Sequence, residues 1–247
     1  PAAVLSSYYR PISHYFRQNF SQVTNPPIDS LRENKVMSLK TRFGNLGNIL
    51  DFDNLTEENI YVLESPILTN SQFKKFKNFF KNKIKVIDCT FDISSSLKDR
   101  IEKIRDESEI AVREGSNNLI LSDKKISTSR ASIPSVLAVG AIHSHLVRLG
   151  IRGYCSINVE SSDILDTHSF AVLIGVGATT VNPYLAIESI YERFQKKLFS
   201  DLDFETCVAK FKKSIDNGLL KIMSKMGISV ISSYRGGCNF EAVGLSR

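Results

Sequence analysis

The middle of the chain shows the clearest alternation of apolar and polar positions. Residues 83–91, KIKVIDCTF, are rich in β-branched side chains and predict a strand. In residues 94–115 apolar side chains recur at three- and four-residue spacing, which predicts a helix that ends at Gly115. Residues 117–123, NNLILSD, contain a continuous apolar run, which is typical of a strand in a parallel sheet.

The same rhythm continues toward the carboxyl terminus. Residues 133–150 predict a helix with Pro134 near its first turn and Gly150 at its end. Residues 154–161 predict a strand, and residues 166–190 predict a short helix, a turn of small residues, a strand ending at TVNP and another helix. Strands and helices in this order predict βαβ units with right-handed crossovers, and therefore an α/β domain with parallel strands.

The flanking segments are less regular. Residues 8–20 carry apolar and aromatic side chains at a spacing near that of a helix, which predicts a helical N-terminal segment. Residues 59–70 predict a strand followed by a turn, and residues 69–80 predict a helix. Near the other end, residues 204–227 predict a long helix and residues 228–234, ISVISSY, predict a strand.

Composition places the chain among globular proteins. Its 247 residues are 42% apolar and 23% charged, and the length fits one large α/β domain or two smaller ones. The net charge of +6 is scattered, apart from a lysine cluster at residues 73–85 that a solvated helix face explains. Because no nucleic-acid-binding motif and no run of about 18 apolar residues is present, we expect neither a nucleic-acid nor a membrane partner.

The cysteines and the first residues bear on location. Cys89, Cys155, Cys207 and Cys238 lie far apart without C-x-x-C spacing, so the sequence predicts no metal site. Reduced thiols are usual inside the cell, and we expect a cytoplasmic protein. The start, PAAVLSSYYRP, lacks the features of a signal peptide. It begins in mid-pattern with a proline, so we expect a piece of a longer protein.

Two short motifs were candidates for chemistry, and each has a structural alternative. His143 and His145 lie two positions apart in a predicted helix, so their side chains point about 200° apart and do not share a metal ion. Residues 175–183, GVGATTVNP, contain G-x-G without the full dinucleotide fingerprint, and indicate either close backbone packing or a phosphate contact. No nucleophile stands beside a base in a pattern that predicts a hydrolase triad.

Two cationic residues near the carboxyl terminus are candidate anion contacts. Lys225, between two methionines, either faces a flavin or phosphate or is an ordinary helix-end lysine. Arg235 precedes two glycines in SYRGG, where a guanidinium is suited to contact an anion.

Longer motifs resemble a known family. They are, in order, YYRPISHYFRQNFSQVTNPPIDSLRENKVMSL, LESPILTN, NLILSD, IPSVLAVGAIHSHLVRLGIR, HSFAVLIGVGATTVNPYLAIESI, GLLKIMSKMGIS and SYRGGCNFEAVGLS. Together they closely resemble the central domain of the glutamate synthase large chain, over nearly all of the sequence. Local departures are Ser144, where the family has a second histidine, and Gly237 with Cys238, where it has Ala-Gln.

The resemblance implies a fold and a division of the chain. The expected fold class is α/β, with parallel-strand βαβ units that form an incomplete β/α-barrel-like central domain behind a helical N-terminal segment. Residues 1–220 would be the central domain. Residues 221–247 would be its end, leading toward a missing FMN-binding barrel.

The resemblance also implies an activity for the parent enzyme. Glutamate synthase makes glutamate reductively from glutamine and 2-oxoglutarate, with FMN and an iron–sulfur cluster. Its central domain joins the amidotransferase domain to the FMN domain and helps to wall the ammonia tunnel. This sequence lacks the amidotransferase nucleophile, the FMN barrel and the cluster cysteines. We therefore expect no catalytic residue and no cofactor in the chain itself, with the remaining glutamate synthase domains or chains as its partners.

Residues 19–39, NFSQVTNPPIDSLRENKVMSL, contain a stiff Asn-Pro-Pro corner, because each proline restricts itself and its predecessor. One hypothesis is that the corner belongs to an interdomain wall or the tunnel mouth, with four polar side chains facing it: Gln22, Thr24, Asn25 and Asp29. The alternative is a structural corner that leads into a helix.

Two further hypotheses come from other classes. The chain could be a stand-alone flavin- or phosphate-binding module that uses residues 175–183, Lys225 and Arg235. It could also be a protein-interaction module, because missing neighbours would leave apolar surface exposed. Whether it is a split subunit or a gene remnant is open at this point.

Overall fold

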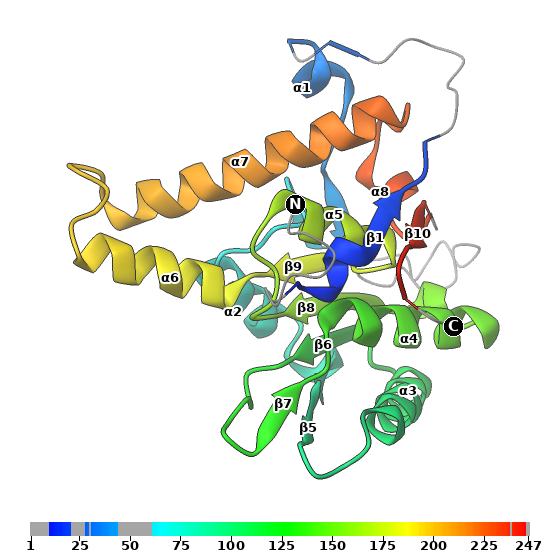
Figure 1. The fold of residues 1–247 in the computed structure, drawn as a ribbon. Helices are drawn as coiled ribbons and strands as arrows, with labels where there is room; N and C mark the ends of the chain where they lie inside the picture. Colours follow the sequence, from blue (N-terminus) through cyan, green and yellow to red (C-terminus); the bar gives the residue numbers. More distant parts are fainter. Residues whose placement is uncertain (1–9, 21–27, 30, 44–60, 238, 246–247) are drawn as a thin grey trace.

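A four-stranded parallel sheet forms the centre of the structure, which is a computed structural model (Figure 1). The residues described are 10–20, 28–29, 31–43, 61–237 and 239–245. The strands lie in the order β4 (Ile84–Asp88), β6 (Asn118–Ser122), β8 (Ser156–Glu160) and β9 (Thr180–Asn182). Because spatial neighbours follow one another along the chain, the order is that of part of a β/α barrel. The predicted α/β class with parallel βαβ units is confirmed.

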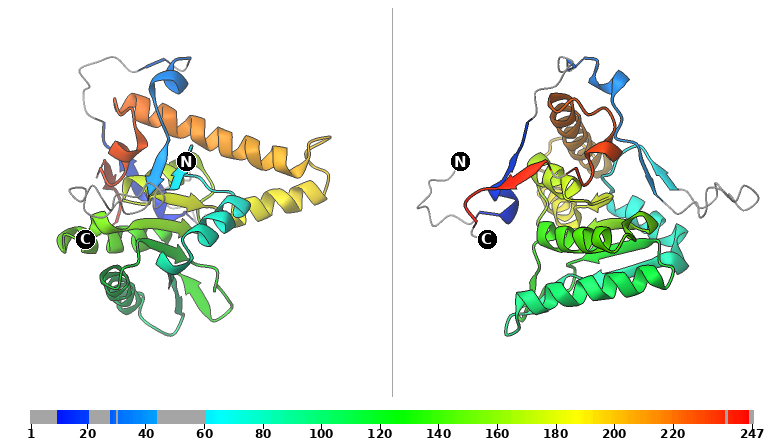
Figure 2. Two further views of the ribbon diagram at one scale, coloured as in Figure 1. Left: turned by 180° about the vertical axis from the view of Figure 1, so that it is seen from behind. Right: turned by 90° about the vertical axis from the view of Figure 1, so that its right-hand side faces the viewer.

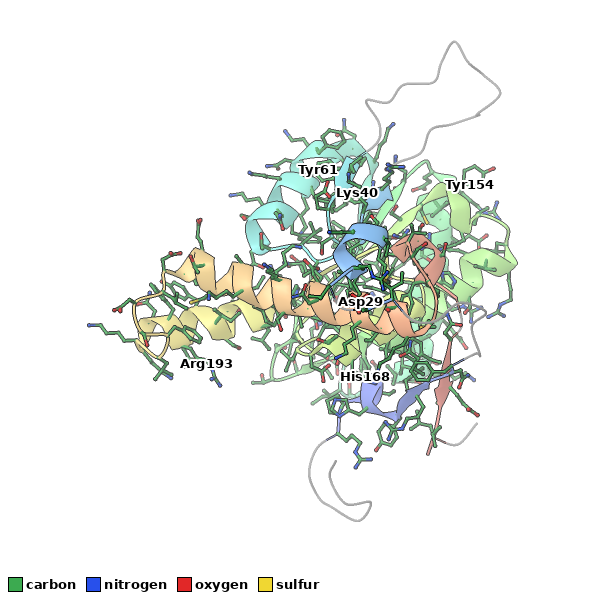
Figure 3. The ribbon with its side chains drawn as sticks, turned by 90° about the horizontal axis from the view of Figure 1, so that it is seen from above. Asp29, Lys40, Tyr61, Tyr154, His168 and Arg193 are labelled. Carbon is green, nitrogen blue, oxygen red and sulfur yellow. The ribbon has the colours of Figure 1, made fainter. Side chains whose placement is uncertain are left out.

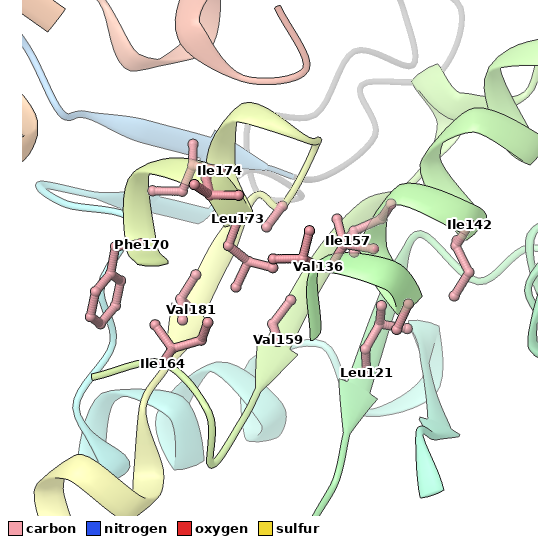
Figure 4. Close-up of a cluster of buried hydrophobic side chains, with 14 of the residues drawn as sticks. Leu121, Val136, Ile142, Ile157, Val159, Ile164, Phe170, Leu173, Ile174 and Val181 are labelled. Carbon is pink, nitrogen blue, oxygen red and sulfur yellow. The ribbon is translucent and has the colours of Figure 1, made fainter. Parts of the chain in front are cut away.

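Three helices connect these strands and pack on one face of the sheet. They are α3 (Leu97–Arg113), α4 (Ser135–Arg148) and α5 (Thr167–Gly175). Leu121, Ile157 and Val181 from successive strands point into one apolar core with them (Figure 4). All three side chains are at most 2% exposed, so this core contributes the main hydrophobic stabilisation.

The opposite face of the sheet is covered by α2 (Asn70–Phe79). The side chain of Ile120, in the middle of β6, points away from the main core and packs with Phe73 and Phe76 of α2 in a second cluster. The helix begins at a capping box, in which Thr69 and Gln72 each hydrogen-bond the other's backbone N–H. In a closed β/α barrel this face would point into the barrel, so α2 covers the face that the missing strands would enclose.

Polar side chains also line this inner face. Asn158 in β8 donates to the Asn118 side chain in β6 at 3.2 Å, and Thr180 in β9 donates to Asn158 at 2.7 Å. None of the three has any exposed surface. Because buried polar groups are costly unless they are paired, this row fixes the register of β6, β8 and β9 more strictly than apolar packing would.

Two long helices form a hairpin that projects beyond the sheet (Figures 1 and 2). They are α6 (Tyr184–Gln195) and α7 (Phe204–Lys225). The ring of Tyr191 meets that of Phe204 edge-on at 5.3 Å near the tip. At the other end Leu219 and Met223 of α7 are buried in the main core, which anchors the hairpin to the body of the domain.

The first and last described segments pair with each other. Strand β1 (Phe16–Gln18) runs antiparallel to β10 (Phe240–Ala242), as Figure 1 shows. The helix predicted over residues 8–20 is therefore wrong: in the described residues from 10 onward, a 3₁₀ turn, Ile12–Tyr15, precedes the strand. Backbone pairing with a segment more than 200 residues away in the sequence overrides the local spacing.

The strand predicted over residues 228–234 is also wrong. Residues Ile231–Tyr234 form the short helix α8, and only Val230 makes a single bridge, to Ser38. Ile231 and Tyr234 lie three positions apart and both have no exposed surface, which is helical spacing. A short apolar run does not distinguish a strand from a buried helical turn by periodicity alone.

The remaining elements are short. They are α1 (Glu33–Val36), the antiparallel pair β2 (Thr41–Phe43) and β3 (Tyr61–Leu63), and the pair β5 (Thr90–Asp92) and β7 (Arg130–Ser132). The boundary expected at residue 220 lies inside the continuous helix α7. Among the described helices, none combines the length and apolar character that a membrane span requires.

The inner-face cluster gives a stability prediction. Phe76→Ala should lower the free energy of unfolding by about 3–5 kcal/mol, because the ring is fully buried between α2 and Ile120. Phe79→Ala is the matched control, since Phe79 is 50% exposed on the same helix. Denaturant unfolding followed by circular dichroism measures both, and equal losses would contradict the assignment of α2 to the inner face.

Candidate functional site

The carboxyl ends of the four parallel strands carry one polar side chain each. Asp88, Ser122, Glu160 and Asn182 stand in a single register row across β4, β6, β8 and β9. This edge of a β/α sheet is where ligands and catalytic groups are usually held. We call these four residues and their partners the carboxyl-edge network, and it is the candidate functional site.

Glu160 is the most buried charge of the row, with 4% of its surface exposed. Ser122 donates to its Oε2 at 2.7 Å, while the Nζ atoms of Lys124 and Lys77 lie 3.0 and 3.2 Å from its Oε1. Burial opposes ionisation, but the Ser122 hydrogen bond and the two lysines outweigh it, and the pKa of Glu160 lies below its usual value. The carboxylate is therefore ionised and fully engaged.

Asn182 and Lys77 tie α2 to the sheet. The Asn182 amide donates to the Leu68 carbonyl and to the Asn70 side chain, both at 2.9 Å, where α2 begins. Lys77 in the last turn of α2 reaches Glu160. Polar bonds at both ends of the helix thus position it over the inner face.

Asp88 at the end of β4 is engaged in the same way. Its Oδ1 accepts bonds from the Thr90 backbone and hydroxyl at 3.0 and 2.7 Å, and its Oδ2 lies 3.1 Å from Arg130 and 3.4 Å from Lys125. Burial opposes ionisation, yet the Thr90 bonds and Lys125 outweigh it and lower the pKa of Asp88. Arg130 links β7 to this edge.

A second layer of the network lies in the loop after β8. Asp123 accepts from the Ser162 backbone and hydroxyl at 2.9 and 2.7 Å. Asp163 accepts from the Ser135 backbone N–H at 3.0 Å and from the Ser161 hydroxyl at 2.6 Å. These carboxylates thereby fix the loop against the start of α4.

The Asp123 side chain also affects its neighbour in α6. Burial, and then the Asp123 carboxylate, raise the pKa of the Tyr184 phenol above its usual value, so Tyr184 stays protonated. Lys124 lies over the Tyr184 ring, 5.0 Å from its centroid. The other Asp123 oxygen, Oδ1, is buried without a hydrogen-bond partner among the described residues.

The space inside this edge is small. A cavity of about 10 Å³ is lined by residues of the network, including Asp123, Ser135 and Glu160, and by Cys89. That volume is close to the minimum for one water molecule, so it holds no substrate. Burial raises the pKa of the Cys89 thiol to about 12, which leaves it protonated and a poor nucleophile.

The chemistry of the network is that of a scaffold. Among the described residues of the edge, each carboxylate accepts hydrogen bonds from a neighbouring serine, threonine or backbone N–H, and Asp88 and Glu160 also pair with cations. A general acid or base needs a titration near neutral pH, whereas the pKa values of Asp88 and Glu160 are lowered. The arrangement is suited to fixing loops and α2, not to proton transfer.

Sequence reasoning missed this network, although a signal was present. Each predicted apolar strand ends in a polar residue, as in KVID, LILSD, INVE and TTVN. In a parallel sheet such residues meet at one edge. Lys77 comes from outside the βαβ pattern, and the spacing of residues 73–85 does not reveal its buried partner.

The residues predicted for the interdomain wall fall mostly outside the described part. Gln22, Thr24 and Asn25 lie outside the described residues. Asp29 lies over α7 (Figure 3), where its carboxylate accepts from the backbone N–H groups of Leu31 and Arg32 at 3.0 and 3.1 Å. The Arg32 hydrogen bonds outweigh its slight desolvation and lower the pKa of Asp29, which holds the turn before α1.

The two predicted anion contacts have different surroundings. Lys225 is the last residue of α7 and is exposed. Arg235 follows α8 and is half-buried, close enough to Arg152 for that charge to lower its pKa. The structure therefore places Arg235 beside a second arginine that sequence reasoning did not single out.

The small-residue motif at residues 175–183 serves packing. A side chain at Gly177 would lie 2.3 Å from the His143 ring, and one at Gly175 would lie 2.3 Å from Phe240. The glycines therefore allow close contact at the amino ends of the strands. His143 and Phe240 occupy the space beside the glycines.

His143 and His145 contact different partners, as their spacing on α4 predicts. The His145 Nε2 atom lies 2.9 Å from a Glu109 oxygen on α3. The Nδ1 atom of His143 accepts from Arg152 at 3.1 Å. The two side chains therefore point to different partners, as helical spacing of two residues requires.

The ion pairs of Glu160 give a prediction with a pH dependence. Glu160→Gln should lower the free energy of unfolding by about 2 kcal/mol at pH 7, because two lysines lose their carboxylate. A lowered folded-state pKa stabilises the fold fully above the ordinary value of 4.5, and this contribution is lost as the pH falls through the folded-state pKa.

The difference in melting temperature between wild type and Glu160→Gln should therefore shrink as the pH falls from about 5 to 3. Thermal unfolding across that range measures it. Glu102→Gln, at an exposed site on α3, is the control and should show little change at any pH. A difference that stays constant to pH 3 would contradict the assigned ion pairs.

Comparisons with known proteins identify the family. The model of the glutamate synthase central domain matches residues 1–246. The NADPH glutamate synthase large chain of Azospirillum brasilense is 57% identical over 250 aligned residues, and that of Bacillus subtilis is 43% identical over 253. The ferredoxin-dependent chloroplastic enzyme of Oryza sativa is 40% identical. Each alignment covers 100% of this chain and 16% of the relative.

Among solved structures, the flavin-binding domain of baker's yeast flavocytochrome b2 is similar with a TM-score of 0.44 and 16% identity. That match covers 82% of this chain and 48% of the other. The family match extends over the whole described α/β fold and is far stronger in sequence. This chain belongs to the glutamate synthase central-domain family.

Proposed function

We propose that the chain is the central-domain segment of a glutamate synthase, an enzyme that reductively converts glutamine and 2-oxoglutarate into glutamate. It joins the amidotransferase domain to the FMN domain, helps to wall the ammonia passage between them, and is inactive by itself. One observation carries the proposal: the chain aligns from end to end with glutamate synthase large chains but spans only 16% of their length.

The carboxyl-edge network supports a structural role. Glu160 and Asp88 are held ionised by cations, and the Cys89 thiol is protonated. Catalysis and the FMN and iron–sulfur groups would therefore come from the other domains of the enzyme, which are the proposed partners. An edge whose charges are paired within the domain and whose side chains are fixed is suited to a connecting domain, because such a domain holds its neighbours at a fixed separation.

The pairing of β1 with β10 supports the joining role. It brings residues 16–18 and 240–242 side by side. In the longer relatives, the polypeptide before and after these segments would be anchored at the same side of the domain. We further propose that residues 1–220 form the body of the domain and that residues 221–247 lead toward the FMN-binding domain.

In the sequence the Asn-Pro-Pro corner, residues 25–27, comes after β1 and directly before Ile28. Asp29 uses its carboxylate to hold the turn before α1. The segment is also attached to α7, because the Ser224 hydroxyl donates to the Ile28 carbonyl at 2.9 Å. We assign Asp29 to fixing the corner, and Gln22, Thr24 and Asn25 to the polar lining of the passage.

A stand-alone interaction module is the alternative with a specific observation in its favour. Val86 on β4 is 54% exposed, and β4 has only one neighbour in the described sheet. An exposed apolar side chain on a free strand edge is suited to a protein contact. In a longer chain the neighbouring domains would cover it.

Substitution of the corner in a full-length glutamate synthase carrying this domain tests the passage. Asn25→Ala should leave glutamine hydrolysis intact and raise the ratio of glutamine hydrolysed to 2-oxoglutarate-dependent glutamate formed, because ammonia escapes. Both rates are measured in one assay. Asn82→Ala, at an exposed site beside β4, is the control. A ratio equal to that of wild type would sink the passage assignment.

A further inference from the structure

The amino ends of the parallel strands hold two arginines that have no acidic partner among the described residues. Arg152 lies in the turn before β8, and Arg235 lies between α8 and β10. Neither guanidinium forms an ion pair with an Asp or Glu among the described residues. Two other half-buried arginines pair with acids, Arg100 with Glu107 at 2.7 Å and Arg130 with Asp88, whereas Arg105 contacts the His145 ring at 3.2 Å.

The position of Arg152 is fixed by three neutral acceptors. Its Nε donates to Nδ1 of His143 at 3.1 Å, and its two terminal nitrogens donate to the carbonyls of Cys155 at 2.5 Å and Gly177 at 2.9 Å. Since Arg152 can only donate, His143 accepts at Nδ1, which places the ring proton on Nε2. A guanidinium has five N–H groups, so two remain for another acceptor.

His143 stays neutral in this position. Burial, and then the Arg152 charge, lower its pKa below the usual value. The ring sits between Gly177 and Gly236, at each of which an added side chain would come within 3 Å of it. The histidine therefore positions Arg152 and adds no negative charge.

Arg235 completes the cluster. Its Nε is buried and has no hydrogen-bond partner among the described residues, although the residue as a whole is only half-buried. Burial, and then the charge of Arg152, lower the pKa of Arg235 to about 10. Two adjacent cations with unused donors are costly unless an anion joins them.

We propose that Arg152 and Arg235 bind one oxyanion group, a carboxylate or a phosphate, between their guanidinium groups. Planar forks of N–H donors suit such a group, and charge-assisted bonds to it are strong. The site lies beside the paired strands β1 and β10. Arg152 donates to the carbonyl of Gly177, and Gly175, two residues earlier, packs against Phe240 of β10. The group is either an acidic side chain from outside the described residues, such as one of an adjoining domain, or a free anion reached from outside.

A map of a full-length glutamate synthase carrying this domain tests the proposal directly. We expect an oxygen of a carboxylate or a bound anion about 2.8 Å from Nε of Arg235. An Asp or Glu of another domain there would assign an interdomain ion pair. Separate density with no chain connection would assign a free anion. No oxyanion within hydrogen-bond distance of either guanidinium would overturn the proposal.

Variants of the same full-length enzyme give a second readout. With a free anion, inorganic phosphate titrated at constant ionic strength should raise the melting temperature, and Arg235→Gln should weaken the apparent affinity about tenfold. With an interdomain carboxylate, Arg235→Gln should lower the melting temperature without phosphate dependence, and replacing the identified acid should give no further loss.

Lys225→Gln is the matched control, since it removes one exposed positive charge from the end of α7. It should leave both the phosphate response and the melting temperature unchanged. Equal effects of Arg235→Gln and Lys225→Gln would mean a general charge effect and would overturn the site. The ammonia coupling ratio of the Asn25 variant is independent of these measurements, so the two proposals fail separately.

Discussion

Burial of the Glu160 carboxylate is the constraint on which the arrangement of this domain depends. An unpaired carboxylate in the interior is far too costly to keep, so cationic side chains must reach it. Lys124 comes from the segment after β6 and Lys77 from α2. Because Lys77 supplies one of the two, α2 has to lie across the inner face, and its phenylalanines then cover Ile120. The charged row at the carboxyl ends of the strands thus determines which helix covers the inner face of the sheet.

The two ends of the sheet differ in their charge balance. At the carboxyl ends, the acids of the register row have basic or hydroxyl partners within the domain. At the amino ends, Arg152 donates to three neutral acceptors, and neither it nor Arg235 pairs with an acid among the described residues. The first end is complete in itself, which suits a rigid support. The second end has surplus positive charge where β1 and β10 pair, which suits attachment to something outside the described residues.

The sequence predicted those parts of the fold that local patterns determine. The strands at β4, β6, β8 and β9 and the helices between them follow from apolar periodicity, because each element buries a face of its own. The local pattern gave the wrong element where contacts with distant segments determine the secondary structure. Phe16 pairs with Ala242 in a two-stranded sheet, and Ile231 lies in a buried helical turn. The carboxyl-edge network was not predicted, because Lys77 reaches Glu160 from outside the βαβ pattern, and the arginine pair was predicted only in part. Arg235 was found beside its glycines, but its partner Arg152 comes from the turn before β8.

The proposed joining role requires that position be transmitted between neighbouring domains, and the structure offers two routes for this. One runs from the β1–β10 pair through Phe240 and Gly175 into α5 and the main core. The other runs from Asp29 and Ile28 onto α7, whose buried end reaches the same core. Both routes end on side chains with little freedom to move, because the core is closely packed. In the proposed joining role, a small shift of an outer domain would therefore reach both Asp29 and the arginine pair, although their chemistry is separate.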